Sequence, residues 1–178
     1  MVNRVLIILI FATLMACNND NDIQPVVDNV PSLSATVGNN LAFVVKEDSV
    51  KSVFRIDAAT GIWNLAIYGR MEQGGEIHTL AINISGKDYE SVAVGSVFSD
   101  FYSDFPALGS YGRYSPQEES LAVSRVPDGT FCTITKIDHD KKIISGTFSV
   151  VAGYTHDYDQ LIEITNGVFN AVPYNQAK

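Results

Sequence analysis

The sequence predicts an all-β fold: an antiparallel β-sandwich or a flattened β-barrel of about 8–10 strands with a C-terminal meander. Short runs rich in Val, Ile, Thr, Phe and Tyr alternate with turn residues such as Gly, Asn and Asp. None of these runs shows the three-four spacing of an amphipathic helix. A sandwich is the simplest packing for hairpins with one apolar face, whereas a barrel would remove exposed edges, and both alternatives stay open.

Two β-hairpins are predicted in the first part of the domain: residues 33–37 with 41–45, and residues 53–56 with 62–68. The first turn is Gly-Asn-Asn at 38–40, and both residue types accept a positive φ angle. The second turn ends at Gly61, which is expected in the left-handed region. Trp63 lies on the apolar face of its strand and is predicted to be a core residue.

A longer strand is predicted at residues 76–85. One of its faces is formed by His78, Leu80, Ile82 and Ile84. The following residues, 86–120, are predicted to be a long loop or irregular crossover with a short strand at 92–94. Aromatic side chains gather in residues 98–114, where we expect them to cover the sheet core; the alternative is that they grip a sugar or an apolar ligand.

The C-terminal third contains three similar triplets, each within or at the start of a predicted strand: Gly129-Thr130-Phe131, Gly146-Thr147-Phe148 and Gly167-Val168-Phe169. Their spacings are unequal, so they indicate edge or core contacts in one sheet and not a repeat protein. Polar connections at 138–142 and 155–159 separate three strands, which are therefore predicted to form the meander.

The N-terminal residues have the order of a secretory leader. Arg4 precedes an apolar run at residues 5–14, which is too short to cross a bilayer, and the run ends in Leu14-Met15-Ala16-Cys17. This tetrapeptide resembles a bacterial lipobox. The resemblance implies that residues 1–16 are a lipoprotein signal peptide and that the Cys17 thiol carries a diacylglyceryl chain. Further acylation of the amine of Cys17 would give two or three chains, enough for stable anchoring to a membrane lipid.

The resemblance also predicts a location and a domain organisation. Asn18 follows the cysteine, so the aspartate linked with inner-membrane retention is absent, and an outer-membrane lipoprotein on the periplasmic face or the cell surface is expected. Residues 17–32 contain the lipidated cysteine and a polar, proline-marked flexible tether. Residues 33–178 are predicted to be a single all-β domain.

Segments at both ends of this domain carry a second resemblance. Residues 129–138, 144–148 and 164–174, together with residues 33–40, resemble an uncharacterised family of small Bacteroidota lipoproteins. That resemblance implies a lipidated all-β domain. It transfers no activity and no functional residue.

Charge and composition argue against several functions. The formal net charge is −8, and removal of residues 1–16 with Arg4 would leave 11 basic and 20 acidic residues. Nucleic acid is therefore not an expected partner, because its phosphates are bound through Lys and Arg. With Cys17 lipidated, Cys132 has no partner for an intrachain disulfide and is predicted to be a small buried residue of a strand.

We predict no catalytic, cofactor-binding or metal-binding residue, and therefore no enzyme. The three histidines His78, His139 and His156 match no zinc-protease spacing, and no nucleophile elbow occurs. Residues 138–140 and 156–159 could supply metal ligands only if their two loops met, and solvated turns are the expected structure. The adjacent Glu118 and Glu119 are interpreted as surface charge.

The sequence thus predicts a non-enzymatic binding or envelope-interaction module, held by acylated Cys17 and working with an envelope protein or a glycan. One alternative is a small-ligand carrier with an internal barrel cavity. Another is a hydrolase with an unrecognised site.

Overall fold

The computed structural model describes residues 30–99, 106–124 and 129–175, and the predicted signal peptide lies outside them. The described residues form eleven β-strands and one short 3-10 helix, η1 (Glu47–Ser49). The strands are β1 (Ser32–Val37), β2 (Leu41–Lys46), β3 (Val50–Ile56), β4 (Trp63–Gln73), β5 (Glu76–Gly86), β6 (Val97–Ser99), β7 (Ala107–Tyr114), β8 (Glu119–Ser124), β9 (Phe131–Asp138), β10 (Ile143–Tyr154) and β11 (Asp157–Pro173). No helix in these ranges is long and apolar enough to cross a membrane.

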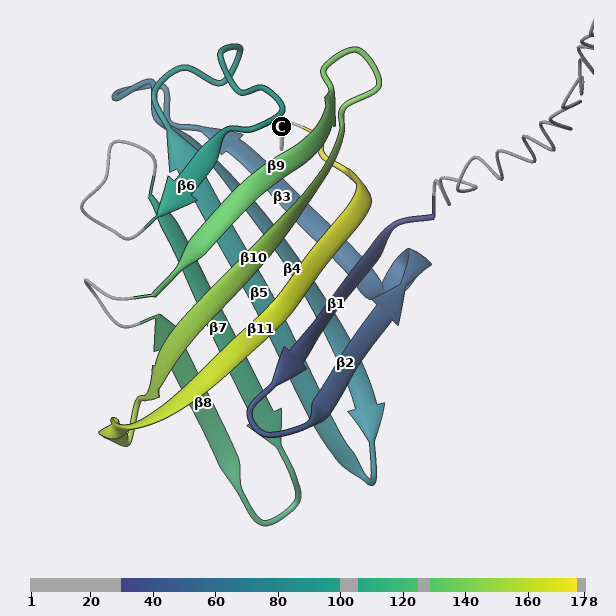
Figure 1. The fold of residues 1–178 in the computed structure, drawn as a ribbon, viewed down its shortest axis with the longest axis vertical. Coiled ribbons are helices and arrows are strands. Elements are labelled where there is room, and N and C mark those ends of the chain that lie inside the picture. The colour runs from purple at the N-terminus through teal and green to yellow at the C-terminus, as the bar shows by residue number, and fades with distance from the viewer. Residues whose placement is uncertain (1–29, 100–105, 125–128, 176–178) are drawn as a thin grey trace, which may run out of the picture.

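All eleven strands belong to one antiparallel sheet, which confirms the predicted all-β class. The main path is β2-β1-β11-β10-β8-β7-β5-β4-β3, with β9 paired to β10 and β6 paired to β9. The sheet folds over itself, so that β6, β9, β10, β11, β1 and β2 lie across β8, β7, β5, β4 and β3 (Figure 1). The path is not closed into a barrel, and the result is a sandwich made from one bent sheet.

The bend occurs along β10, because this strand belongs to both layers. On one side it pairs with β11 over most of its length. On its other side, residues from Ile143 to Ser149 pair with β9, whereas Ala152, Gly153 and Tyr154 pair with β8. A single long strand therefore connects the two layers through backbone hydrogen bonds.

The predicted hairpins and the C-terminal meander are confirmed. Gly38 has φ +55° in the β1–β2 turn, and Gly61 has φ +70° in the β3–β4 turn, where an L side chain would be strained. In the second turn, Asp57 accepts a hydrogen bond from the Ala59 backbone N–H at 2.8 Å. That bond holds the pKa of the Asp57 carboxyl below its ordinary value. The predicted order β9-β10-β11 is also observed.

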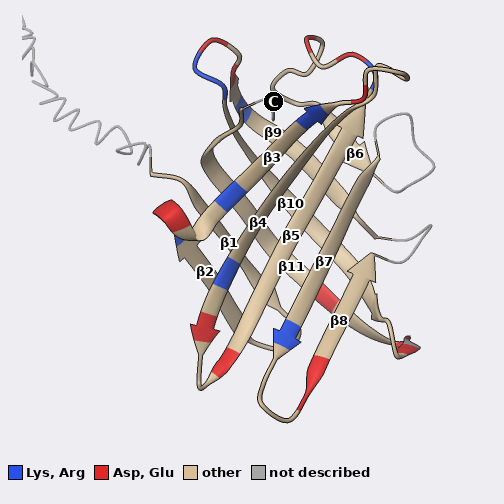
Figure 2. Ribbon diagram, turned by 180° about the vertical axis from the view of Figure 1, so that it is seen from behind, with Lys and Arg blue, Asp and Glu red and all other residues tan. Residues whose placement is uncertain are grey.

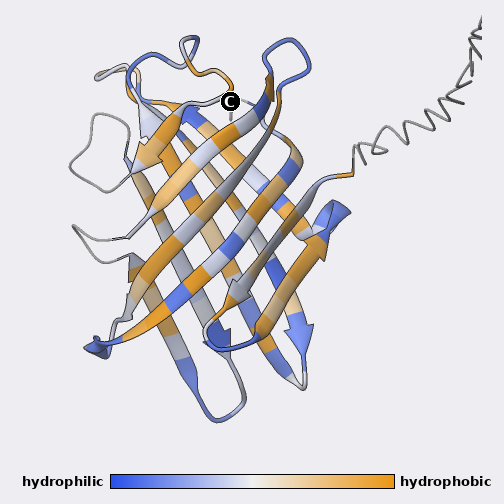
Figure 3. Cartoon of the chain, in the orientation of Figure 1, coloured by the Kyte–Doolittle hydropathy of each residue, from blue (hydrophilic) through white to orange (hydrophobic). Residues whose placement is uncertain are grey.

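The hydrophobic core lies between the two layers, and the strands alternate in hydropathy as period-two burial requires (Figure 3). On β5, His78, Leu80, Ile82 and Ile84 all face this core, as predicted. The two layers approach each other closely at glycine residues that face the core. A Cβ atom on Gly69 of β4 would lie 2.5 Å from the Val45 side chain of β2. The interior is filled at this crossing.

Two of the three C-terminal triplets, at 146–148 and 167–169, pack against each other on the paired strands β10 and β11. Thr147 pairs with Val168, so each phenylalanine lies beside the glycine of the other triplet. A Cβ on Gly146 would lie 2.4 Å from the Phe169 ring, and one on Gly167 would lie 2.6 Å from the Phe148 ring. The glycines provide the space that the two buried rings occupy, which explains the pattern in β10 and β11. The third triplet differs, because Phe131 is 53% exposed and Gly129 lies against Val151.

Residues 86–120 are more regular than predicted. Residues 92–94 are not a strand; they belong to a loop with a turn at residues 94–95, and the short strand β6 follows at Val97–Ser99. The second departure is β7, a full strand of eight residues. Its glycines concealed it in the sequence, yet Gly109 is required there because an added Cβ would lie 2.4 Å from the Val150 side chain of β10.

Charged side chains are concentrated at strand ends and in turns, as Figure 2 shows for the β3–β8 side. Lys51 and Arg55 lie near the two ends of β3, Arg70 lies further inside β4, and all three are exposed. Arg70 pairs with Glu72 at 2.7 Å. Such exposed pairs contribute little to stability, so the fold depends on its apolar interior.

Candidate functional site

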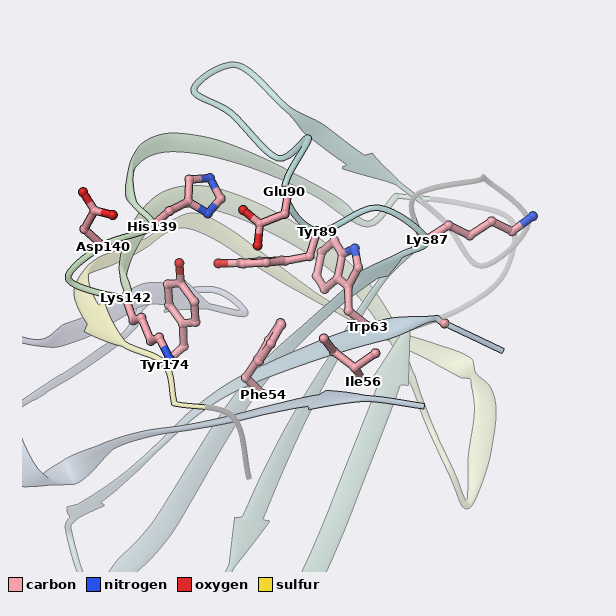
Figure 4. Close-up of a pocket in the computed structure, with 11 residues that line it drawn as sticks. Phe54, Ile56, Trp63, Lys87, Tyr89, Glu90, His139, Asp140, Lys142 and Tyr174 are labelled. Carbon is pink, nitrogen blue, oxygen red and sulfur yellow. The ribbon is translucent and has the colours of Figure 1, made fainter. Parts of the chain in front are cut away.

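A cavity of about 390 Å³ lies at one end of the sandwich. Its walls come from the adjoining ends of β3 and β4, the connection between β5 and β6, the β9–β10 turn, and the residue after β11 (Figure 4). These segments are far apart in the sequence. The antiparallel topology brings them to the same end of the molecule.

Four aromatic residues form the inner wall, and Tyr89 lies at their centre. Its ring centroid is 4.6 Å from that of Phe54, 5.3 Å from that of Trp63 and 5.5 Å from that of Tyr174. The rings meet edge to face or at a tilt, with interplanar angles between 55° and 74°. These separations are typical of stabilising aromatic pairs. Phe54, Trp63 and Tyr174 are buried, whereas Tyr89 is half-buried.

Tyr89 is positioned by the way its loop attaches to β9. Gly95 donates a backbone hydrogen bond to Ile134 at 2.8 Å, and Ile134 donates one to Ser96 at 3.0 Å. Val92 is buried in the core and anchors the middle of the loop. The loop therefore lies across the end of the sandwich with the Tyr89 ring over Trp63 (Figure 4).

His139 attaches the same loop to the β9–β10 turn. Its Nε2 atom lies 3.0 Å from the Val92 carbonyl oxygen, so Nε2 carries the proton and donates it. In the neutral ring, Nδ1 is then an acceptor. On the other side of the turn, the Tyr174 backbone N–H donates to the Lys142 carbonyl at 2.9 Å.

The cavity is distinguished by polar atoms that have no partner. Five buried side-chain nitrogen or oxygen atoms lack a hydrogen-bond partner among the described residues. One is Asn83 Oδ1; the other four belong to residues that line the cavity, namely Trp63 Nε1, the Tyr89 and Tyr174 hydroxyls, and His139 Nδ1. Buried polar atoms are usually paired, and an unpaired one costs about 1–3 kcal/mol. Four such costs at one place require an explanation.

The two hydroxyls remain protonated in the neutral pH range. Burial is the main cause that raises the pKa of both Tyr89 and Tyr174. The two hydroxyls also face each other, and the hydrogen-bonding contact between them raises the pKa of Tyr89 further and acts in the opposite direction on Tyr174. Although the hydroxyls influence each other in this way, neither makes a hydrogen bond of good geometry. Each can therefore donate and accept.

The charges around the cavity are balanced. Lys87, Glu90, Asp140 and Lys142 line it and are exposed. Figure 2 shows acidic and basic residues together in the loops at this end of the molecule. In Figure 4, Lys87 and Asp140 extend away from the aromatic wall. Two positive and two negative side chains give the rim no net charge.

The other candidate residues do not form a site. His78 Nδ1 lies 2.7 Å from the buried Tyr111 hydroxyl, and His139 is in the cavity. The His156 ring lies at a tilt to the Tyr154 ring, with their centroids 5.4 Å apart. The loops at 138–142 and 155–156 lie at opposite ends of β10 and cannot share a metal ion. In the part of the chain that the structure describes, no group of three or more His, Cys, Asp or Glu residues could hold one.

Several side-chain predictions can be compared with the structure, although Cys17 lies outside the described residues. Cys132 is buried, as predicted, and burial raises the pKa of its thiol to about 12. Phe98 and Tyr111 of the aromatic segment are core residues, while residues 100–105 are not described. His139, predicted in a solvated turn, is half-buried because its ring packs on Tyr89, with centroids 5.4 Å apart.

The cavity is not predicted from the sequence. Phe54, Tyr89 and Tyr174 received no role, and Trp63 was assigned only to the core. The available signal was weak: Phe54 and Trp63 lie inside predicted strands, and Tyr89 lies in the segment 86–120 that is predicted to be a loop. Comparisons of the chain with protein-family models, curated proteins and solved structures found no match.

Two tyrosine-to-phenylalanine substitutions should have opposite effects on stability. Tyr111 is 4% exposed and Tyr174 is 2% exposed, but only Tyr111 has a partner, His78. Tyr111→Phe leaves a buried imidazole nitrogen unpaired and should lower the free energy of unfolding by about 1–3 kcal/mol. Tyr174→Phe removes an atom that is already unpaired and should leave this free energy unchanged or higher. Urea unfolding of both variants measures the difference; equal destabilisation would show that the Tyr174 hydroxyl is paired.

Proposed function

We propose that this protein is a non-enzymatic binding module, and that its binding site is the aromatic cavity. The observation that carries the proposal is the gathering of four unpartnered buried polar atoms around one cavity. A closed structural end would be more stable with apolar groups at these positions. A ligand that forms hydrogen bonds with these atoms would offset the free energy lost by leaving them unpaired, which gives the polar groups a function at these positions.

The hydrogen bonding of His139 and the exposure of the nearby carboxylates favour binding over catalysis. The His139 imidazole is held by the Val92 carbonyl, and the carboxylates of Glu90 and Asp140 lie on the exposed rim. A cavity at the end of a sandwich also fits a binding module better than a carrier with an internal cavity, because Gly69 and Gly109 bring the layers into contact.

We further propose that the domain is anchored to the outer membrane through acylated Cys17, on the periplasmic face or at the cell surface. The support is the order of Arg4, the apolar run and Leu14-Met15-Ala16-Cys17. β1 begins at Ser32, so residues 17–31 are available as a tether between the lipid and the domain. About 15 extended residues reach at most ~50 Å, so the domain could stand clear of the membrane surface.

The anchor predicts a thiol count. In the processed, acylated protein the Cys17 sulfur is a thioether, so Cys132 is the one free thiol left of the two cysteines. Native protein should react very slowly with a thiol reagent, since Cys132 is 1% exposed. Unfolded protein should take up one equivalent. Cys17→Ala should abolish membrane fractionation or leave the leader uncleaved, and a processed Cys17→Ala protein that stays with the membrane would contradict the proposal.

The binding site can be tested with two matched substitutions in one hairpin. Ile56 and Ile62 are 44% and 41% exposed, but only Ile56 lines the cavity. Ile56→Trp should fill the cavity, whereas Ile62→Trp should leave it open. We expect some members of a panel of sugars, amino acids and nucleobases to raise the melting temperature of the wild type and of Ile62→Trp, but not of Ile56→Trp. Equal shifts in all three proteins, or no shift in any, would exclude the cavity as the site.

A further inference from the structure

We propose that the ligand of this cavity is a neutral saccharide of one or two rings, bound by Trp63, Tyr89, Tyr174 and His139. This inference rests on the proposed binding function and specifies its ligand class. It follows from the hydrogen-bonding capacity, ring geometry, charge and size of the cavity.

The hydrogen-bonding capacity matches hydroxyl groups. Trp63 Nε1 can only donate, Nδ1 of the neutral His139 ring can only accept because Nε2 carries the proton, and the two tyrosine hydroxyls can do both. A ligand that satisfies all four must offer donors and acceptors close together. Each sugar hydroxyl is both. A carboxylate would leave Nδ1 unsatisfied, because it offers no proton in the neutral pH range.

The ring geometry argues against a flat aromatic ligand. Such a ligand stacks best between two parallel rings, and the rings of Phe54, Trp63 and Tyr174 each stand at 55° to 74° to the Tyr89 ring. Phe54 and Trp63 are closer to parallel, at 30°, but their centroids are only 6.4 Å apart, which leaves no room for a flat ring between them. A pyranose ring instead presents C–H groups from one face to a single aromatic ring and directs its hydroxyls outward. Aromatic side chains that combine an apolar face with a polar tip, as Trp and Tyr do, match that arrangement.

Charge and size lead to the same class. The rim residues Lys87 and Lys142 are balanced by Glu90 and Asp140, so nothing at the cavity selects a net charge. The volume of about 390 Å³ is near the lower end of the range for small-ligand sites. It accommodates one or two sugar rings, and a longer chain would have to continue past the rim.

The Tyr89 side chain controls whether a ligand can reach the polar atoms of the aromatic wall. The four polar atoms lie just beneath the cavity surface, and Tyr89 is the half-buried ring that covers Trp63. It belongs to a connection between strands, whereas Phe54 and Trp63 are strand residues. Rotation of this one side chain would expose the indole N–H of Trp63 and the Tyr174 hydroxyl to a ligand.

Trp63 is the sole tryptophan of the chain, so its fluorescence reports on the cavity directly. The processed, acylated protein is titrated in a detergent without a sugar headgroup. The probes are glucose, galactose, mannose, N-acetylglucosamine, maltose and cellobiose, with glycine, adenine and inorganic phosphate as comparators. We expect at least one saccharide to change the Trp63 emission saturably, and the comparators to have no effect.

Three substitutions that each remove one hydroxyl test whether the change in Trp63 emission arises from binding in the cavity. Tyr89→Phe and Tyr174→Phe should each weaken saccharide affinity by about tenfold, since each deletes one hydrogen bond. Tyr68→Phe is the matched control, because Tyr68 is 42% exposed on β4 and does not line the cavity. Its affinity should be unchanged. Two independent variants keep the test valid if one of them folds poorly.

The outcomes separate this inference from the proposed function. If adenine or glycine binds with the same dependence on Tyr89 and Tyr174 and no saccharide does, the cavity is a binding site but the saccharide class is wrong. If no probe changes the emission, the saccharide proposal is overturned, and the melting-temperature panel with Ile56→Trp decides whether the cavity binds anything. Saccharide binding that Tyr68→Phe weakens as much as Tyr174→Phe would also overturn it.

Discussion

The structure depends on β10, the strand that both layers share. Because β10 pairs with β11 on one side and with β9 and then β8 on the other, the sheet must bend along it. The bend closes one side of the core, and glycines such as Gly69 and Gly109 let the layers meet. Strand ends and connections from five parts of the chain are thereby gathered at one end of the sandwich. The cavity is a consequence of this topology.

The cavity combines well-packed aromatic rings with buried polar atoms that have no hydrogen-bond partner among the described residues. Its aromatic rings pack well and its loop is attached at Gly95, Ile134 and His139, so the position of Tyr89 is defined. The polar tips of the same residues find no partner within the described protein. Proteins accept such costs at functional sites, where a bound molecule can offset them. The contrast between the paired Tyr111 and the unpaired Tyr174 shows both situations within one core.

Local chemistry explains how much of the fold could be predicted from the sequence. Gly38 and Gly61 marked their turns, and His78 was placed correctly because period-two burial is a local property. β7 was missed because Gly109 weakens the strand signal, and the Val150 side chain that requires this glycine is about 40 residues away. The cavity was missed for the same reason. Phe54, Tyr89 and Tyr174 meet only after the long-range pairing has formed.

The central claim is that the Trp63 indole N–H is unbonded in the free protein and becomes bonded when a ligand occupies the cavity. A ¹⁵N–¹H correlation spectrum tests this directly, because one tryptophan gives one indole signal. We expect a proton shift typical of an unbonded indole in the free protein, and we expect this signal to move downfield as a neutral saccharide is added. An indole proton that is already in the hydrogen-bonded range and unaffected by any saccharide would contradict it.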